Sequence, residues 1–442
     1  MKTIIIGGVA AGMSGASKLR RLDKDAIIHV YEKGTDLSYG ACGMPYYLGG
    51  LIENEEKLIA RTKSDFEKKN IKVFLKHEVV KVNPKAKTIE VKNLEQNKII
   101  NDKYDKLVIA VGTKANRTNI LGTDKANIQV LNKLSDARKL KPLIDKAKSV
   151  AIIGGGYIGL EIAENLAHLG KKVDIIERLP QLLPIYDKVI AKKAQTALEA
   201  IGVNIYLEEN LEEYLQKNNK TIIKTNKNSF EEDLVIEAIG VRPNTEFLKD
   251  IGLDMLSNGA IIVNDKMETS LKDIYAGGDC VSYHHLLTNK NAFVPLGTHA
   301  NKAGRVIAEN IAGNKEIFSG IVGSNIIKVD KLAIAKTGLG YQEAKRENFN
   351  YEYVDITAKN QAGYYPGAKE IFIRIVYEPK TGILKGAQIV GEKGVSSRIN
   401  IMALAITKGL TAKEFSGLDL AYAPPFSPVW DPLQIATNQI KV

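Results

Sequence analysis

Short apolar runs that end at a glycine recur along the 442-residue chain. They occupy residues 3–7, 107–112, 150–154 and 234–240. An unbroken apolar run of about 4 to 8 residues is typical of a strand buried on both faces of a parallel sheet. Ligands bind beyond the ends of such strands, in the region that these glycines occupy. The pattern therefore predicts an α/β fold with ligand sites at the strand ends.

Two segments, 3–32 and 150–177, repeat one order of elements: strand, glycine turn, helix, strand. In the first segment these elements are residues 3–7, 7–12, 13–22 and 26–32, and in the second they are 150–154, 154–159, 160–169 and 172–177. Each copy ends in an acid, Glu32 or Glu177. Two Rossmann-like strand–turn–helix–strand units are expected.

The two glycine turns predict two dinucleotide sites. Gly154, Gly156 and Gly159 satisfy the G-x-G-x-x-G spacing, whereas the first turn has Val9 at its middle position. A tight turn lets the backbone approach a pyrophosphate, whose charge meets the free N–H groups of a helix start. The acid about 20 residues further on accepts the ribose hydroxyls.

After about residue 325 the pattern changes. Strand-like segments alternate with turns, and a helical stretch follows; these segments are 351–357, 370–377, 384–390 and 396–408. A separate α+β domain is expected at the C-terminal end.

Composition narrows the class. Apolar residues make up 44% and charged residues 26%, with no apolar run long enough for a membrane span. Two cysteines and a start that lacks a signal-peptide pattern predict a cytoplasmic protein. The net charge of +11 comes without zinc-finger or RNA-binding signatures, so neither nucleic acid nor a membrane is expected as a partner. No metal site is expected. The basic cluster at residues 18–24 suits a ligand with several phosphates.

Cys42 lies in a glycine-rich loop at residues 38–45. No second cysteine follows within a few residues, so its sulfur must pair with a substrate sulfur or cycle through sulfenic acid. A helix start near Pro45 predicts a lowered thiol pKa. Cys280, directly after Asp279, is expected to be an inert core residue.

Four segments together resemble a known family, the FAD-dependent pyridine nucleotide–disulfide oxidoreductases. These segments are residues 38–42 (SYGAC), the second glycine turn, 240–244 (GVRPN) and 275–279 (YAGGD). The chain resembles the branch with a single active cysteine, which includes coenzyme A disulfide reductase, NADH oxidase and NADH peroxidase. The resemblance implies an FAD domain at 1–112 and 241–324, an NAD(P)H domain at 113–240 and a dimerisation domain at 325–442. It also implies a homodimer with tightly bound FAD.

Three positions separate the members of that branch. Oxidases and peroxidases carry a histidine where this chain has Ala10, and coenzyme A disulfide reductases carry two tyrosines that match Tyr364 and Tyr422. Tyr365 is the alternative to Tyr364. The resemblance therefore implies electron flow from NAD(P)H through FAD to Cys42, and on to coenzyme A disulfide or a similar small disulfide by a mixed disulfide on Cys42. The alternatives are an NADH oxidase or peroxidase, a persulfide or polysulfide reductase, and a non-catalytic redox-sensing flavoprotein.

Two departures from the family pattern, Tyr39 and Ala41, bear on coenzyme A recognition, since the family often has asparagine before the cysteine. The absence of a rhodanese-like domain after residue 442 disfavours the persulfide alternative.

The resemblance also assigns site residues. Those implied for FAD are Gly7, Gly8, Ala10, Ala11, Gly12, Glu32, Lys33, Val79, Val80, Ala110, Gly112, Asp279, Pro295 and Thr298. Those implied for NAD(P)H are Gly154, Gly156, Tyr157, Ile158, Gly159, Glu161, Glu177 and Gly240. Those implied for the substrate are Ser14, Lys18, Arg21, Ser38, Asn301 and Trp430.

Glu177 also predicts a preference for NADH over NADPH. A carboxylate at the ribose repels a 2′-phosphate, although the neighbouring Arg178 softens this effect.

Overall fold

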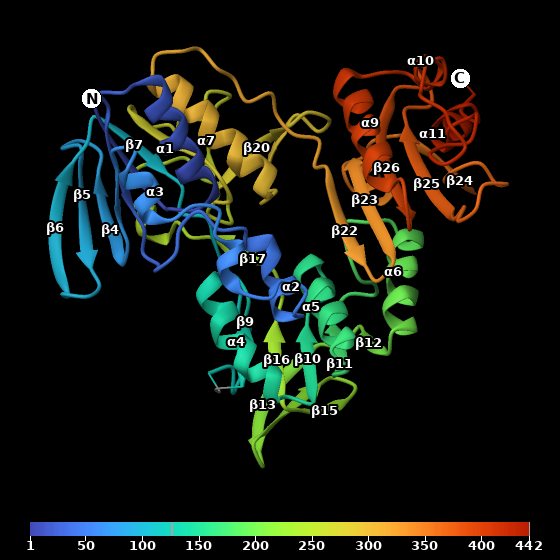
Figure 1. Ribbon diagram of the computed structural model, residues 1–442, viewed down its shortest axis with the longest axis horizontal. Helices are drawn as coiled ribbons and strands as arrows, with labels where there is room; N and C mark the ends of the chain where they lie inside the picture. The colour runs from blue at the N-terminus through green and yellow to red at the C-terminus, as the bar shows by residue number, and fades with distance from the viewer. Residues whose placement is uncertain (125–126, 442) are drawn as a thin grey trace.

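The computed structural model describes residues 1–124 and 127–441, which form three lobes (Figure 1). The N-terminal lobe and the C-terminal lobe lie side by side, and the middle of the chain forms the third lobe below them. Within the described residues, no helix is both long and apolar enough to cross a membrane.

The N-terminal lobe is built on a parallel sheet in the order β19-β7-β1-β2-β3. Its strands are β1 (Lys2–Ile6), β2 (Ile27–Tyr31), β3 (Ile71–Phe74), β7 (Lys106–Ile109) and β19 (Ile274–Ala276). Its helices are α1 (Ala10–Leu22), α3 (Lys63–Glu67) and α7 (Gly297–Ile311), with the short 3₁₀ turn η3 (Glu246–Leu248). Smaller sheets flank it: β4 (His77–Asn83), β5 (Thr88–Asn93) and β6 (Lys98–Lys103), and β18 (Ile261–Ile262), β20 (Val281–His285) and β21 (Lys290–Ala292). Between β2 and α3 the chain forms η1 (Ala41–Gly43), α2 (Met44–Leu48) and η2 (Glu55–Leu58), and Met44, Leu48 and Leu58 of this segment are buried in the core of the middle lobe.

The middle lobe repeats this plan with a parallel sheet in the order β12-β11-β10-β16-β9. Its strands are β9 (Ile128–Val130), β10 (Ser149–Ile153), β11 (Lys172–Glu177), β12 (Val203–Leu207) and β16 (Leu234–Glu237). Its helices are α4 (Leu134–Lys146), α5 (Tyr157–His168) and α6 (Lys188–Ala200), and an antiparallel sheet of β13 (Leu211–Lys217), β14 (Lys220–Thr225) and β15 (Ser229–Glu232) is attached.

The chain passes twice between these two lobes, and the two passages pair with each other. β8 (Thr113–Ala115) and β17 (Val241–Pro243) form a two-stranded antiparallel ribbon. The predicted domain boundaries after residues 112 and 240 fall at the start of these two strands; as an exact division of the chain they stay a prediction.

The C-terminal lobe is an antiparallel sheet covered by helices, the α+β arrangement expected for this part. Its strands run in the order β22 (Asn325–Val329), β23 (Leu332–Gly338), β26 (Leu384–Gly391), β25 (Glu370–Tyr377) and β24 (Glu352–Lys359). Its helices are α8 (Tyr341–Arg346), α9 (Val395–Lys408), α10 (Ala412–Ser416) and α11 (Pro432–Thr437). An apolar core of its own holds this lobe together.

The helices that follow the two glycine turns begin earlier than the sequence pattern predicts. α1 starts at Ala10 rather than residue 13, and α5 starts at Tyr157 rather than residue 160. Neither helix has a side-chain cap at its start. The first helical N–H groups therefore lie inside the glycine turns, where an anion can reach them.

Candidate active site

The first glycine turn is held by Glu32. Its carboxylate accepts hydrogen bonds from the N–H groups of Gly8 at 2.7 Å and Gly34 at 2.6 Å. A Cβ on Gly12 would lie 2.0 Å from the carbonyl oxygen of Gly7, so only glycine lets α1 start so close to β1. Glu32 thus stands beside the turn, in the position at which a ribose is expected.

The second glycine turn has the same construction. The carboxylate of Glu177 accepts from the N–H groups of Gly155 at 2.6 Å and Leu179 at 2.8 Å. A Cβ on Gly159 would lie 2.1 Å from the carbonyl oxygen of Gly154. The structure therefore brings together the glycines and the acid of each copy, as the internal repeat predicts.

Asp279 has the feature expected of a residue that meets a polar ligand. Its Oδ1 atom is buried and has no hydrogen-bond partner among the residues that the structure describes, and burial raises the pKa of the carboxyl group. The preceding Gly278 lies against the start of α1, since a Cβ there would be 3.0 Å from that of Ala11. An orphaned buried carboxylate beside an uncapped helix start fits a polyhydroxylated nucleotide such as FAD.

Other residues predicted for the two cofactors lie around these turns. Ala110 donates its N–H to Ile6 at 2.8 Å, and Gly112 (φ 61°) follows it at the end of β7. Gly240 (φ 94°) accepts from the N–H of Asn116 at 2.9 Å. The remaining predicted residues belong to elements that lie near the two turns. Val79 and Val80 lie on β4, and Ile158 lies in the first turn of α5. Pro295 and Thr298 lie at the start of α7. Lys33 is exposed and pairs with Glu78 at 2.7 Å.

Cys42 lies in η1, directly before α2, and its side chain is exposed. Protein atoms still crowd the thiol, and this burial raises its pKa, with further contributions from the carboxylates of Glu161 and Asp279. The predicted lowering of this pKa is therefore wrong for the chain alone: α2 has only five residues, and two carboxylates oppose the thiolate. Cys280 has no exposed surface, and burial raises its pKa to about 12, so its thiol is inert.

Glu161 and Tyr46 form a pair near Cys42 that sequence reasoning missed in part. Tyr46 donates to Glu161 Oε1 at 3.4 Å, from α2 to α5. Burial raises the pKa of Glu161 to about 7, with a smaller contribution from Glu164. Tyr46 follows Cys42 by four residues, the spacing of one helical turn, and this is the signal that could have singled it out.

Tyr157 is held by a neighbour from another lobe. Its hydroxyl donates to Asn325 Oδ1 at 2.6 Å, and the hydroxyl of Tyr186 donates to the same atom, also at 2.6 Å. The two tyrosine rings meet edge to face. Asn325 begins β22 of the C-terminal lobe, so the first residue of α5 is tied to that lobe.

The structure brings Tyr364 and Tyr422 together, and not Tyr365. The two hydroxyls lie 3.3 Å apart, and this hydrogen bond raises the pKa of Tyr422. Both side chains are exposed on the C-terminal lobe. No contact joins either of them to Cys42 of the same chain within residues 1–124 and 127–441.

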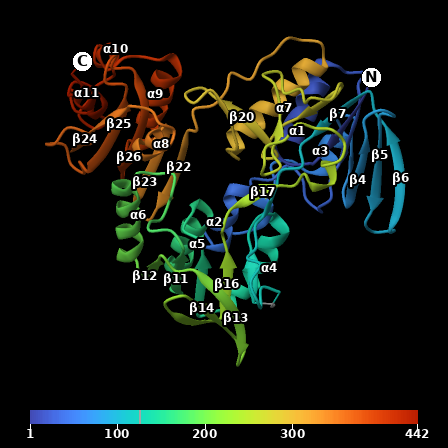
Figure 2. The same cartoon turned by 180° about the vertical axis from the view of Figure 1, so that it is seen from behind.

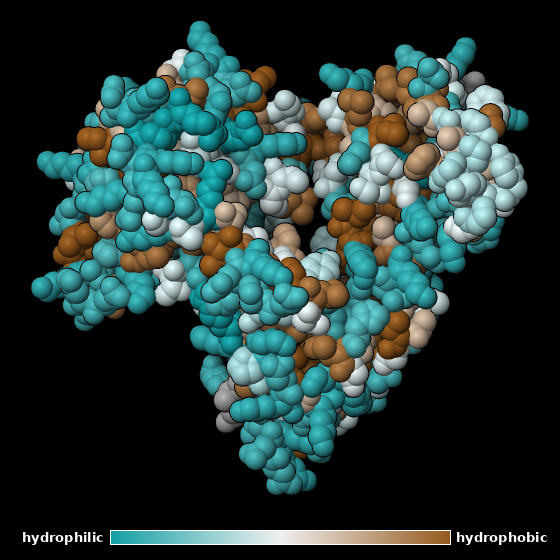
Figure 3. Space-filling model, viewed as in Figure 1, coloured by the Kyte–Doolittle hydropathy of each residue, from teal (hydrophilic) through white to brown (hydrophobic). Residues whose placement is uncertain are grey.

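Exposed apolar side chains gather in the same lobe. Leu404 of α9 is 61% exposed, and Phe426, Val429 and Trp430 are 77%, 68% and 57% exposed, respectively. Figure 3 shows apolar atoms over α9, on the side of this lobe that faces the N-terminal lobe. Side chains of this size are rarely left in water without a partner surface.

The residues predicted for the substrate divide into two groups. On α1 and α7, Ser14 donates to Asn301 Oδ1 at 2.5 Å, and Lys18 pairs with Glu309 at 2.6 Å. Arg21, one turn further along α1, is exposed. Ser38 (φ 50°) donates its N–H to the carbonyl of Gly8 at 2.8 Å and so ties the Cys42 loop to the first turn. Trp430 lies apart from them, on the C-terminal lobe.

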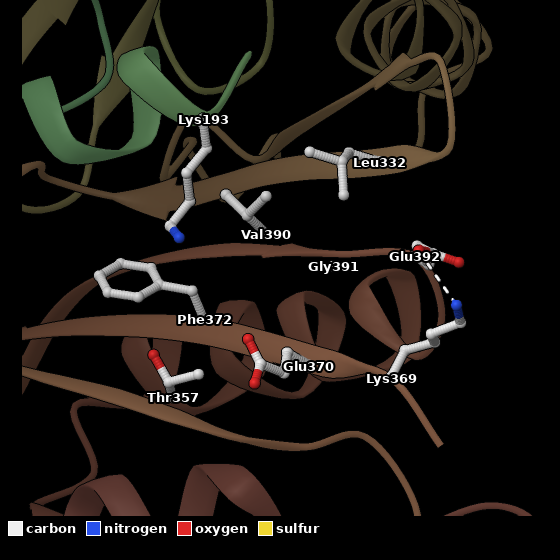
Figure 4. Close-up of a pocket in the computed structure, with 9 residues that line it drawn as sticks. All are labelled: Lys193, Leu332, Thr357, Lys369, Glu370, Phe372, Val390, Gly391 and Glu392. Carbon is white, nitrogen blue, oxygen red and sulfur yellow. Dashed lines mark ion pairs between the residues drawn. The ribbon is translucent and has the colours of Figure 1, made fainter. Parts of the chain in front are cut away.

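A hollow of about 210 Å³ opens between α6 and the C-terminal sheet (Figure 4). Lys193 lies over the ring of Phe372 at 4.9 Å, and Lys369 pairs with Glu392 at 3.7 Å at its other end. None of the residues predicted for the active site lines it. In the described part of the chain, no group of three or more histidine, cysteine, aspartate or glutamate side chains is arranged to hold a metal ion.

Comparison with known proteins defines the class. Residues 1–303 match the model of the pyridine nucleotide-disulphide oxidoreductase family, and residues 325–432 match the dimerisation domain of the same family. The chain belongs to this family, a family of FAD- and NAD(P)H-dependent enzymes. The family, the α/β fold and the C-terminal dimerisation domain predicted from the sequence are confirmed.

Individual relatives are similar over nearly the full length. A coenzyme A disulfide reductase of Staphylococcus haemolyticus is 34% identical over 96% of both chains. An NAD(P)H sulfur oxidoreductase (CoA-dependent) of Pyrococcus furiosus is 36% identical over 100% of this chain and 99% of its own. The crystal structure of reduced Bacillus anthracis CoADR-RHD superposes with a TM-score of 0.97 at 34% identity, covering 99% of this chain and 80% of that one.

Proposed function

We propose that the chain is a coenzyme A disulfide reductase: NAD(P)H supplies electrons, and Cys42 passes them to the disulfide of coenzyme A or of a similar small thiol. The observation that carries this proposal is a single accessible thiol. Cys42 is exposed, whereas Cys280 is fully buried, so no second protein sulfur can complete a disulfide. The partner sulfur then comes from the substrate.

The turns around Gly12 and Gly159 would hold FAD and NAD(P)H, respectively, and the carboxylates of Glu32 and Glu177 would face their riboses. Asp279, with its free Oδ1, would accept from a hydroxyl of FAD. When bound, FAD relays two electrons from NAD(P)H to sulfur.

Cys42 reacts directly with the substrate disulfide. Its thiolate attacks the substrate disulfide, forms a mixed disulfide and releases the first thiolate. The hydrogen bond between the hydroxyls of Tyr364 and Tyr422 raises the pKa of Tyr422, so Tyr422 keeps its proton and can donate it. In a homodimer joined through the exposed apolar surface of the C-terminal lobe, the tyrosine pair of one protomer would face Cys42 of the other and hydrogen-bond the departing thiolate.

Recognition of coenzyme A would use the basic face of α1. Arg21 is exposed, and Lys18 could exchange Glu309 for a phosphate. Ser14 and Asn301 are hydrogen-bonded to each other at the same face. Ser38 and Trp430 complete the set, and Trp430 would be supplied by the C-terminal lobe of the second protomer.

NADH is the preferred electron donor in this proposal. Glu177 has only 7% of its surface exposed, and two backbone N–H groups fix its carboxylate in place at the ribose position. A fixed charge there repels the 2′-phosphate of NADPH. We place the protein in the cytoplasm, because both cysteines are free.

A second candidate activity is reduction of persulfide or polysulfide, which the full-length similarity to the Pyrococcus furiosus enzyme favours. Oxidase or peroxidase activity is disfavoured, since Ala10 offers no acid or base beside the thiol.

The intact mass of the non-reduced protein tests these activities against one another. An adduct of one coenzyme A on Cys42, released by dithiothreitol, is the expected result, and a gain of one oxygen would favour the oxidase. Cys42→Ser should abolish disulfide turnover, while the matched control Cys280→Ser should keep it. Full turnover by the Cys42→Ser protein would refute the proposed function.

A further inference from the structure

Glu161 is a half-buried acid without a cation. Among the residues that the structure describes, it has no ion-pair partner, and its hydrogen bond from Tyr46 is long at 3.4 Å. Lys328 of β22, a cation that packs against α5, is already engaged by Glu164, one turn further along that helix. A carboxylate in these surroundings readily accepts a proton.

The pair of Tyr46 and Glu161 is built onto the same short segment as Cys42. η1 carries Cys42, and α2 follows at once with Tyr46, four residues later. α2 packs closely on α5, because a Cβ on Gly49 would lie 2.3 Å from the side-chain oxygen of Asn165. Backbone contact at Gly49 therefore fixes the distance between the Cys42 segment and the acid.

Several charged and titratable groups surround this pair. α5 contributes Glu161, Glu164 and His168, α2 contributes Tyr46, and β22 contributes Lys328. His168 Nε2 lies 3.8 Å from Glu164 and 3.5 Å from Asp330. Asp279 adds a further carboxylate near Cys42. Burial and Glu161 raise the pKa of Cys42, and burial and Glu164 raise the pKa of Glu161 to about 7. A negative charge on Cys42 therefore disfavours a negative charge on Glu161, and the reverse also holds.

We propose that Tyr46 and Glu161 form a proton-holding pair: Glu161 binds a proton when Cys42 becomes a thiolate and releases it when Cys42 re-forms a disulfide. Tyr46 positions the carboxyl group. This inference deepens the proposed function and rests on it, since only a cysteine that alternates between these two states needs such a pair.

The step balances. NAD(P)H gives up two electrons and one proton; the electrons break the bond between Cys42 and the substrate sulfur and leave two thiolates. Glu161 binds the proton, and a proton from water neutralises the first departing thiolate. Attack of the Cys42 thiolate on the next disulfide re-forms the mixed disulfide and expels a second thiolate, which takes the proton from Glu161. One disulfide, one NAD(P)H and one proton yield two thiols.

The test is the pH profile of Cys42 alkylation in the holoenzyme, after reduction with dithiothreitol and removal of the reductant. Iodoacetamide labelling followed by mass spectrometry reports on Cys42 alone, because Cys280 is inaccessible. Two inflections are expected in the wild type, the lower one near neutral pH from Glu161. Glu161→Gln removes the opposing charge, so the lower inflection should vanish and alkylation at about pH 8 should be about tenfold faster.

Two variants sharpen the result. Tyr46→Phe removes the hydrogen bond that lowers the pKa of Glu161, so the lower inflection should move to higher pH. Glu53→Gln, an exposed control in the same region, should leave the profile unchanged. If Glu161→Gln does not fold, Tyr46→Phe carries the test.

An alkylation profile of Glu161→Gln that matches the wild type, or an equal change in Glu53→Gln, overturns this inference. Neither result bears on the proposed function, which is tested separately by the intact mass of the protein and by the turnover of Cys42→Ser.

Discussion

The two dinucleotide-binding units of this chain use one local design in two different settings. In both, a glycine turn leads into an uncapped helix, and a glutamate at the end of the second strand accepts two backbone N–H groups. The settings differ. The start of α1 is covered by α7, where a Cβ on Gly304 would lie 2.2 Å from the carbonyl of Ala11, and it faces the orphaned carboxylate of Asp279.

Within the described residues, no glycine brings a second helix onto the start of α5 in this way. Its first residue, Tyr157, is held by a hydrogen bond to Asn325, and Arg178 is exposed beside the ribose position. The packing of α7 on α1 and the unpartnered carboxylate of Asp279 suit a cofactor that stays bound. The hydrogen-bonded side chain of Tyr157 suits a cofactor that enters and leaves in every cycle. We therefore expect the first unit to retain its nucleotide and the second unit to exchange its nucleotide.

Substituting the last glycine of each turn should give the largest difference between the two units in nucleotide binding. Gly12→Ala and Gly159→Ala each place a Cβ about 2 Å from a backbone carbonyl oxygen. Gly12→Ala should yield protein without bound flavin. Gly159→Ala should retain flavin and bind NADH more than about 100-fold more weakly, ~3 kcal/mol of strain. Flavin absorbance after gel filtration and NADH titration measure the two effects; full flavin retention in Gly12→Ala would contradict the comparison.

Removing the charge of Glu177 at the ribose position of the second unit should have an intermediate effect, on the choice between NADH and NADPH. Glu177→Gln removes a fixed negative charge, so the preference for NADH over NADPH, measured as the ratio of kcat/KM, should fall about tenfold, ~1.4 kcal/mol. Arg178→Ala should raise the same ratio about threefold, ~0.6 kcal/mol. Glu32→Gln, the matched change in the first unit, should leave the ratio unchanged, and an equal change there would show that the two acids do not serve different nucleotides.

Removing the hydrogen bond between Tyr157 and Asn325 should have the smallest effect on nucleotide binding. Asn325→Ala removes the hydrogen-bond acceptor of Tyr157, so we expect the Tyr157 side chain to move aside more readily for an incoming nicotinamide. NADH should bind about 2- to 10-fold more tightly, corresponding to one hydrogen bond of ~0.5–1.5 kcal/mol. Fluorescence titration measures this affinity, and Asn325→Asp, which keeps an acceptor oxygen, is the matched control. Weaker binding in Asn325→Ala alone would show that the tether helps the nucleotide rather than excludes it.

Sequence pattern was sufficient for the elements but not for all their limits. The predicted strands at 172–177 and 370–377 are those of β11 and β25. The helices α1 and α5 begin three residues earlier than predicted, because each first turn contains the last glycine of the turn motif, which was assigned to the loop. The predicted pKa of Cys42 was wrong for a related reason: its direction depends on carboxylates that arrive from other parts of the chain.

The site residues that lie close together in the sequence could be predicted. The contacts between residues far apart in the sequence could not. Gly12, Glu32, Gly159 and Glu177 could be found by spacing, because each turn and its acid belong to one short segment. Two clusters were not predicted from the sequence: Tyr46 with Glu161, 115 residues apart, and Tyr157 with Asn325, 168 residues apart.

By itself, the sequence determined two strand–turn–helix–strand units, one cysteine in a glycine-rich loop and a C-terminal α+β domain, since backbone turns, helix starts and burial patterns are properties of neighbouring residues. Only the tertiary structure decided that α7 packs on the start of α1, that Lys18 is paired with Glu309, and that Tyr364 rather than Tyr365 meets Tyr422. These outcomes depend on the packing of segments far apart in the chain, where side chains of several types would satisfy the same local pattern.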